Sequence, residues 1–214
     1  MTADTAPVGA RAPTQERSRR TVERLLAAAE AAFAEDGFER ATVRSIATRA
    51  EVPVGSLYQF FTNKAALLES LLTDHLRAVD ELFDELLGAA GDDGGLNVTV
   101  DGATRAVVGR IIELAAARPS FRSMLAGTAT SGPFADAGVR LRARLAGRIA
   151  EALTAASPAN RDLYDRAAAV CAEIMRGLLP RIVDEHGVVD DELRPELEVV
   201  IAAYLFEVKR RERS

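Results

Sequence analysis

Residue types that carry acid–base, nucleophilic or metal chemistry are scarce and scattered in this sequence. The 214 residues include two histidines, His75 and His186, and one cysteine, Cys171. Neither histidine has a second histidine or a cysteine at the spacing that zinc sites and nucleophilic catalysis require. Cys171 is interpreted as a small buried residue rather than a redox sensor. The sequence therefore predicts no catalytic residue, no metal site and no cofactor.

One acidic cluster near the end of the chain offers an alternative, a divalent-cation site. Its members are Asp184, Glu185, His186, Asp190 and Asp191. The cluster falls at a predicted turn between two helices, where a solvated acidic loop is the usual outcome. We therefore favour the solvated loop over the cation site.

The stretch between Thr42 and Lys64, TVRSIATRAEVPVGSLYQFFTNK, has the pattern of short helices with one apolar face and one polar face. Apolar residues recur there at helical spacing, with polar residues between them. Thr42 is a favourable N-cap for one short helix, and Pro53 suits the first turn of another that continues through Phe61. Helices this short need neighbouring helices as a floor. The stretch therefore predicts two helices joined by a tight turn, within a compact domain at residues 15–64.

The remainder of the chain also predicts helices. Ala and Leu dominate segments with a 3.6-residue period, Trp is absent and aromatic residues make up only 5%. Residues 1–14 have the composition of a disordered tail, and glycines at 88–97 mark a flexible loop. We predict an all-α protein of about nine helices with a larger C-terminal helical domain at 65–214. The other predicted helices span residues 15–36, a long segment after Asn63, 99–117, 120–126, 133–156, 160–186 and 191–211.

The net charge of −5 is unevenly distributed along the chain. Residues 1–64 hold nine Lys or Arg against eight Asp or Glu, whereas residues 65–214 hold eighteen against twenty-four. The first part contains a basic run, extended by three later residues, comprising Arg11, Arg17, Arg19, Arg20, Arg24, Arg44, Arg49 and Lys64. These residues form either a surface for a polyanion or an ordinary solvated helix face.

The sequence favours a cytoplasmic location. The N-terminal segment lacks the apolar core of a secretory signal, and one cysteine cannot form an intrachain disulfide. The longest apolar run near the end, at 199–206, is far shorter than the roughly 20 residues that a membrane-spanning helix needs. We therefore expect no association with a membrane.

The pattern at 42–64, preceded by F-x-E-D-G-F at 33–38, resembles the DNA-binding domain of the TetR family of transcriptional regulators. The resemblance covers about residues 15–70. It rests on the joint spacing of a set of residues within the pattern, namely Ile46, Ala47, Ala50, Val52, Gly55, Leu57, Tyr58, Phe61 and Lys64. The resemblance implies a helix-turn-helix domain followed by a C-terminal domain that binds ligand and mediates dimerisation.

The resemblance also implies roles for individual residues toward double-stranded DNA. The start of the second short helix would enter the major groove, where Val54, Ser56 and Gln59 would read bases. Four further positions match those that touch the phosphate backbone in the family, namely Thr42, Arg44, Tyr58 and Lys64. The alternative for single positions is that Ser56 and Gln59 are ordinary exposed polar residues and Tyr58 is core.

The family resemblance further implies a homodimer and a small-molecule effector. Dimerisation would use the last two long helices, residues 160–186 and 191–211, with Leu197 in the seam. The effector would enter the C-terminal domain and shift the long fourth helix. Apolar residues expected around it are Phe83, Ile112, Phe121, Met124, Phe134, Ile174 and Met175, which favours a largely apolar effector; ordinary core packing is the alternative for each.

Two positions depart from the family pattern. Glu51 stands where glycine is usual in the turn, which adds backbone strain and a negative charge beside the DNA. Phe60 stands where Tyr or His is commoner, so a polar phosphate contact is missing. The sequence therefore predicts a DNA-binding regulator, most simply a repressor. The alternatives are an activator, or a helical protein that binds ligands or partners and has weak or lost DNA binding.

Overall fold

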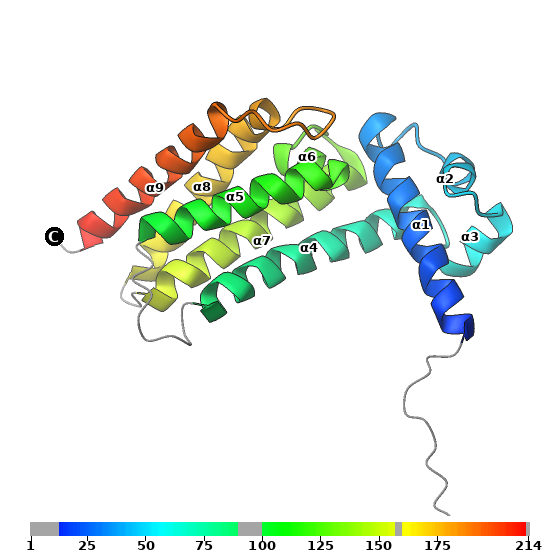
Figure 1. Ribbon diagram of the computed structural model, residues 1–214, viewed down its shortest axis with the longest axis horizontal. Helices are drawn as coiled ribbons and strands as arrows, with labels where there is room; N and C mark the ends of the chain where they lie inside the picture. The colour runs from blue at the N-terminus through cyan, green and yellow to red at the C-terminus, as the bar shows by residue number, and fades with distance from the viewer. Residues whose placement is uncertain (1–12, 90–99, 157–159, 213–214) are drawn as a thin grey trace, which may run out of the picture. The chain divides into compact units, whose positions relative to one another are not determined.

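The structure, a computed structural model, describes residues 13–89, 100–156 and 160–212, and these form nine α-helices (Figure 1). Within these ranges the only β-type pairing is one isolated bridge between Val183 and Val189. The prediction of an all-α fold with about nine helices is therefore confirmed. The chain divides into two compact units, residues 1–67 and 68–214, which are considered separately.

The first unit is built from α1 (Pro13–Glu35), α2 (Val43–Arg49), α3 (Val54–Phe60) and the first turn of α4 (Lys64–Ala89). One stripe of α1 is buried because its apolar residues recur at helical spacing. The core of the unit includes Leu25, Ala29, Phe33, Phe38, Ile46, Ala47, Val52, Leu57, Phe61 and Leu67. These buried residues supply the floor on which the two short helices rest.

Local sequence signals place the ends of these helices. Gly37 follows α1 with a φ of 78°, the left-handed conformation expected of a helix-terminating glycine. The Thr42 hydroxyl accepts a hydrogen bond from the Ser45 amide (3.0 Å), and the Ser45 hydroxyl accepts one from the Thr42 amide (3.1 Å). Asn63 caps α4 by accepting from the Ala66 amide at 2.9 Å. The predicted capping role of Thr42 is confirmed.

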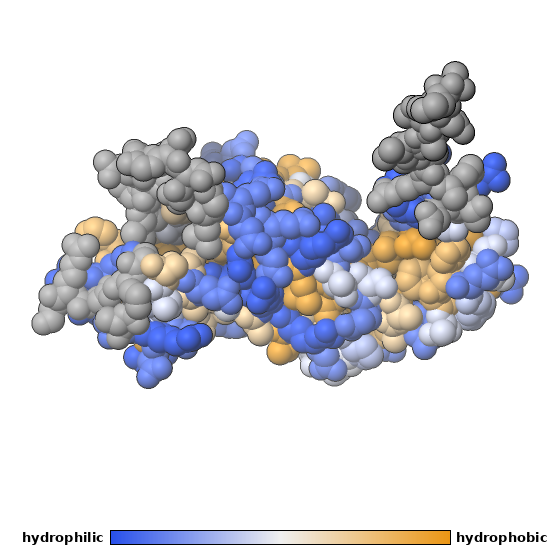
Figure 2. Space-filling model, turned by 90° about the horizontal axis from the view of Figure 1, so that it is seen from below, coloured by the Kyte–Doolittle hydropathy of each residue, from blue (hydrophilic) through white to orange (hydrophobic). Residues whose placement is uncertain are grey.

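The second unit contains the remainder of α4, then α5 (Val100–Ala117), α6 (Pro119–Ala126), α7 (Gly132–Ala156), α8 (Arg161–Ile182) and α9 (Leu193–Glu212). In Figure 1, α8 and α9 lie side by side, α9 also runs along α5, and α7 packs on α8. The side of this unit drawn in Figure 2 carries a broad band of hydrophilic side chains. Three arginines on successive turns of α7 form ion pairs with carboxylates of α4, namely Arg140 with Glu69, Arg144 with Asp80, and Arg148 with Asp80 and Asp84.

The helix predicted at 160–186 is shorter than expected and ends at Ile182. Val183 leaves the helix to form the bridge with Val189. The Asp184 carboxylate then accepts hydrogen bonds from the amides of His186 (2.9 Å) and Val188 (2.8 Å), which stabilises a turn instead of another helical turn. His186 therefore lies in a turn rather than on a helix.

The last helix begins two residues later than the predicted residue 191. The Asp190 carboxylate accepts from the amides of Glu192 and Leu193, both at 2.9 Å, and so caps α9. At the other end of the chain, α1 begins at Pro13, inside the predicted tail; the rest of that tail, residues 1–12, and most of the glycine-rich loop fall outside the described residues. None of the helices in the described ranges combines the length and apolar character needed to span a membrane.

Candidate nucleic-acid interface

The outer face of α3 presents side chains that nothing within the unit covers. Tyr58 is 54% exposed, Val54 is 36% exposed, Gln59 is exposed and Ser56 is half-buried. On the opposite side of the helix Leu57 is completely buried and fixes the rotation of α3 against the core. The structure therefore brings the three predicted base-reading residues and Tyr58 onto one short helix.

Gly55 lies on this exposed helix without a structural need for glycine. A Cβ added at Gly55 would meet nothing within 4 Å, and its φ is not positive. Glycine inside a helix costs about 0.5–1 kcal/mol relative to alanine. A glycine that neither packing nor backbone geometry requires, at the start of an exposed helix, allows an outside partner to approach the backbone closely.

The turn between α2 and α3 is strained at Glu51, as predicted from its place in the motif. Glu51 has a φ of 52° and is the one non-glycine residue with positive φ in the part of the chain that the structure describes. Arg24 of α1 holds this turn, because its guanidinium donates to the carbonyl oxygens of Ala50 and Glu51 and lies 3.4 Å from the Glu51 carboxylate. Arg24 thus stabilises the angle between the two short helices, a role that its position in a basic run does not reveal.

Lys64 is also engaged within the unit rather than extended into solvent. Its Nζ donates to the carbonyl oxygens of Phe38 (2.6 Å), Glu39 (3.0 Å) and Ala41 (3.3 Å), and lies 4.5 Å from the centroid of the Phe38 ring. An ammonium group has three hydrogens, and these acceptors use them. Lys64 therefore fastens the loop between α1 and α2 to the start of α4.

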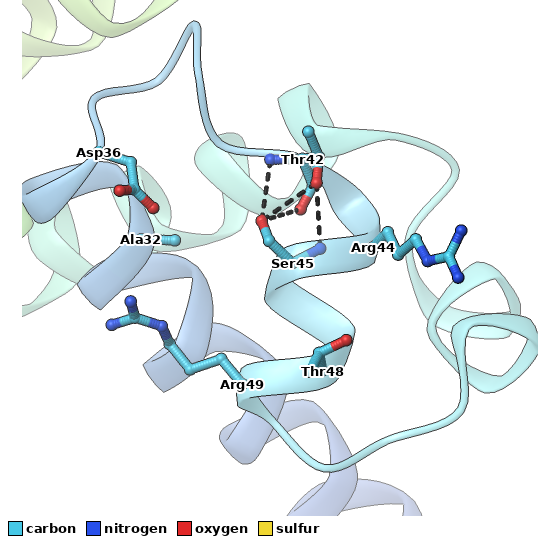
Figure 3. A pocket seen from close by; sticks show the side chains of 7 residues that line it. All are labelled: Ala32, Asp36, Thr42, Arg44, Ser45, Thr48 and Arg49. Atoms are coloured by element: carbon cyan, nitrogen blue, oxygen red, sulfur yellow. Dashed lines mark hydrogen bonds between the residues drawn. The ribbon is translucent and has the colours of Figure 1, made fainter.

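An open hollow of about 590 Å³ lies between the end of α1 and α2 (Figure 3). The residues that line it are Ala32, Asp36, Thr42, Arg44, Ser45, Thr48 and Arg49. Thr42 and Ser45 bond to each other at its rim, while Arg44 and Arg49 point to opposite sides of α2 (Figure 3). The hydroxyl groups of Thr42 and Ser45 and the Ser45 amide bond within the capping motif, whereas Thr48, near the end of α2, is exposed and also lines the hollow.

The two arginines of α2 differ in their availability. Arg49 forms two hydrogen bonds with the Glu35 carboxylate, at 2.8 and 2.7 Å. These bonds to Arg49 hold the pKa of Glu35 below its usual value. Arg44 is exposed, and its guanidinium has no partner among the described residues. Arg44 is thus the α2 cation that a phosphate can reach without breaking an existing ion pair.

The remaining members of the basic run are divided in the same way. Arg19 and Arg20 pair with Glu16, at 3.0 and 3.2 Å. Arg17 is exposed on α1, whereas Arg11 lies outside the described residues. The sequence alone overstated the free positive charge of this unit, because it does not show which arginines have carboxylate or carbonyl partners.

Two comparisons extend these observations. The model of bacterial regulatory proteins of the tetR family matches residues 25–71, and that of the tetracyclin repressor-like C-terminal domain matches residues 99–205. The second match alone covers half of the chain. The protein belongs to the TetR family. The predicted family is thereby confirmed.

Similar proteins agree with this assignment. The chain is 39% identical over 79 residues to a protein of Pseudomonas putida named probable HTH-type transcriptional regulator ArpR, and 36% identical over 76 residues to the HTH-type transcriptional repressor KstR of Mycolicibacterium smegmatis. These alignments span 34% and 36% of this chain, and 38% and 37% of the relatives. A solved TetR-family transcriptional regulator from Streptomyces coelicolor superposes with a TM-score of 0.60 at 27% identity, covering 88% of this chain and 99% of the other.

In this TetR-family chain the seven predicted effector-pocket residues lie in the second unit. Six are buried, and Ile174 on α8 is half-buried. Burial alone does not separate a pocket wall from ordinary core, so their role stays a prediction. Cys171 is completely buried, and burial raises the pKa of its thiol to about 12, which keeps it protonated. Sequence reasoning did not select the buried His75, which hydrogen-bonds Ser120 of α6.

The predicted dimer helices carry apolar side chains on their outer surfaces. Val199 (44%), Val200 (43%) and Phe206 (68%) are exposed on α9, and Val170 (40%) is exposed on α8. Leu197, in contrast, is completely buried within the chain's own core. Placing Leu197 in a seam between protomers was therefore wrong.

Proposed function

We propose that this TetR-family protein is a homodimeric, sequence-specific DNA-binding transcriptional repressor that a small, largely apolar effector releases from a near-palindromic operator. The observation that carries the proposal is the exposed face of α3, held at a fixed angle to α2 by the strained turn at Glu51 and by Arg24. A domain at residues 15–64 would bind DNA, and residues 65–214 would bind the effector and form the dimer.

On this proposal the side chains of α3 divide into base-reading and backbone-contacting groups. Gln59 pairs with adenine through two hydrogen bonds, Ser56 bonds a base edge, and Val54 contacts a thymine methyl group. Arg44, Tyr58 and Thr42 contact phosphates, which fixes register without reading sequence. Lys64 was predicted to contact phosphate as well, but its bonds to the α1–α2 loop support a positioning role.

Dimerisation would place the exposed apolar residues of α8 and α9 against the same residues of a second copy. A two-fold dimer presents two copies of α3, so its half-sites lie about 34 Å apart on one side of the DNA. An effector that prefers a conformation with a different spacing weakens DNA binding by the ratio of its affinities for the two conformations.

The proposal is tested by selecting binding sites from random double-stranded DNA with the purified full-length protein. We expect a near-palindromic site whose affinity falls steeply between about 50 and 200 mM salt. Arg44→Ala should weaken binding to all sequences, whereas Gln59→Ala should cost about 1–3 kcal/mol and relax preference at one base position.

The matched control is Arg77→Ala, which removes an exposed arginine of the second unit whose partners among the described residues are carboxylates of its own helix. The DNA affinity of Arg77→Ala, and the dependence of that affinity on salt, should equal those of the wild type. A protein without sequence preference at low salt, with Arg44→Ala indistinguishable from Arg77→Ala, would instead favour a helical protein that has lost DNA binding.

A further inference from the structure

His75 interrupts the buried apolar stripe of α4 with a polar side chain. It is only 1% exposed, and the other buried residues that the structure describes on this helix are apolar, namely Leu67, Leu68, Leu71, Leu72, Ala78, Val79, Leu82 and Phe83. The Nε2 atom of His75 lies 2.7 Å from Oγ of Ser120 on α6. The imidazole and the Phe121 ring form a T-shaped pair, with the ring centroids 5.5 Å apart and the planes at 84°.

The second ring nitrogen of His75 has no hydrogen-bond partner in the described part of the chain. This Nδ1 atom is inaccessible to solvent. Leaving a buried polar atom unpaired destabilises a protein, so nearly all such atoms in folded proteins have a partner in the protein, in water or in a ligand. An apolar residue at position 75 would avoid this cost, so the imidazole is an exception among the apolar buried residues of α4.

The imidazole of His75 is neutral at physiological pH. Burial, reinforced by the charge of Arg118, lowers its pKa from 6.5 to about 3. A neutral imidazole has one N–H donor and one acceptor nitrogen, and the bond to Ser120 uses one of them. Nδ1 therefore offers a single uncharged hydrogen bond, and a hydroxyl group can satisfy it in either tautomer because a hydroxyl both donates and accepts.

We propose that Nδ1 of His75 is the polar anchor of the effector site, and that it selects a neutral, largely apolar molecule that carries a hydroxyl group. The inference rests on the proposed function, in which the second unit takes a small effector. Ser120 positions the ring through Nε2, and the completely buried Phe121 supplies an aromatic surface beside it. Met124, one turn after Ser120 on α6, is also buried.

Phenol and toluene are suitable probes because they match in size and differ in the hydroxyl group. Binding of both is measured by calorimetry to the full-length wild type and to His75→Phe, which keeps an aromatic ring and removes both nitrogens. The ratio of phenol affinity to toluene affinity should fall about fivefold in His75→Phe, the contribution of one neutral hydrogen bond. An unchanged ratio overturns the proposal.

Nitrogen NMR of the wild type supplies a readout that needs no variant. Phenol should move the Nδ1 resonance of His75, and toluene should leave it in place. An Nδ1 signal that already reports a hydrogen bond without probe, and that phenol does not change, assigns the atom to an internal water and overturns the proposal. The matched control is Thr104→Val, which removes a different buried polar group on α5 and should keep the wild-type affinity ratio.

Selection of DNA sites with the same samples distinguishes failure of the His75 anchor from failure of the proposed function. If the wild type keeps its DNA sequence preference and phenol has no effect on the Nδ1 resonance of His75, only the anchor proposal is contradicted. Loss of sequence preference in the wild type contradicts the proposed function itself.

Discussion

Replacement of Gly55 by alanine should change folding stability and DNA affinity in opposite directions. Gly55 occupies the second position of the exposed helix α3, and an added Cβ meets nothing within 4 Å. Alanine lowers the conformational entropy of the unfolded chain and favours the helix without a steric penalty. The free energy of unfolding should therefore rise by about 0.5–1 kcal/mol.

The expected rise in the unfolding temperature of Gly55→Ala is small but measurable. For a chain of this size, about 1 kcal/mol corresponds to roughly 2–4 °C in the unfolding midpoint. Denaturant unfolding of the full-length protein, followed by circular dichroism, measures the free energy directly. A clear loss of stability in Gly55→Ala would contradict the open surroundings of this glycine.

The same methyl group should weaken DNA binding, because it holds the start of α3 away from the duplex. Loss of one close backbone contact corresponds to about 1–3 kcal/mol, or roughly 5-fold to 150-fold in affinity. Fluorescence anisotropy with the selected operator measures this change. A variant that is more stable and binds the operator as tightly as the wild type would refute docking through this face.

Gly147→Ala provides the matched control for this experiment. Gly147 lies inside α7 in the second unit, and an added Cβ there also meets nothing within 4 Å. Its stability should rise by a similar amount, with no change in operator affinity. The comparison separates a helix-propensity effect, shared by both variants, from a contact that only Gly55 makes.

Three further predictions concern strain, assembly and protonation. Glu51→Gly should leave the free energy of unfolding in urea unchanged or raise it by up to about 1 kcal/mol, because relief of the positive φ offsets or exceeds the entropy cost of glycine. A large loss of stability would show that the ion pair between Arg24 and the Glu51 carboxylate contributes more than the strain costs. Phe206→Glu should give a folded monomer in sedimentation, whereas Leu197→Asp should unfold the chain; a Phe206→Glu protein that remains dimeric would contradict the proposed face. His75 binds a proton more readily when unfolded, because its folded pKa of about 3 lies below 6.5. Stability should therefore fall as pH decreases from about 6.5 toward 3, by at most about 1.4 kcal/mol per unit, and this slope should be weaker in His75→Phe; equal slopes in urea titrations would refute burial of a neutral imidazole.

Local signals explain why much of the fold followed from the sequence. Thr42 caps α2 through Ser45, and Asn63 caps α4 through the Ala66 amide, so both helix starts depend on residues within one turn. Glu51 was expected to strain the turn because the family position favours glycine, and its φ of 52° confirms this. The end of α8 was placed wrongly because it depends on the Val183–Val189 bridge and on the turn formed by Asp184, which helical periodicity does not encode.

The candidate site was predicted only in part. The outward residues of α3 follow from the position of Leu57 in the helical period. The engagement of Lys64 with the loop at 38–41, and of Arg24 with the turn at 50–51, joins residues 23 to 27 positions apart. No local pattern shows which basic side chains meet such carbonyl groups, so Lys64 was assigned to phosphate.

The sequence by itself determined the helical class, the two short helices around Glu51 and the family, because these depend on periodicity, capping and a fixed local spacing. Tertiary structure decided which polar groups remain available. Arg44 is left without a partner among the described residues, whereas Arg49 meets Glu35. One ring nitrogen of His75 hydrogen-bonds Ser120, 45 positions away, and the other is buried without a hydrogen-bond partner in the described part of the chain. Whether a polar group is free to bind a partner depends on segments that are distant in the chain and adjacent in space. Only the folded structure brings those segments together.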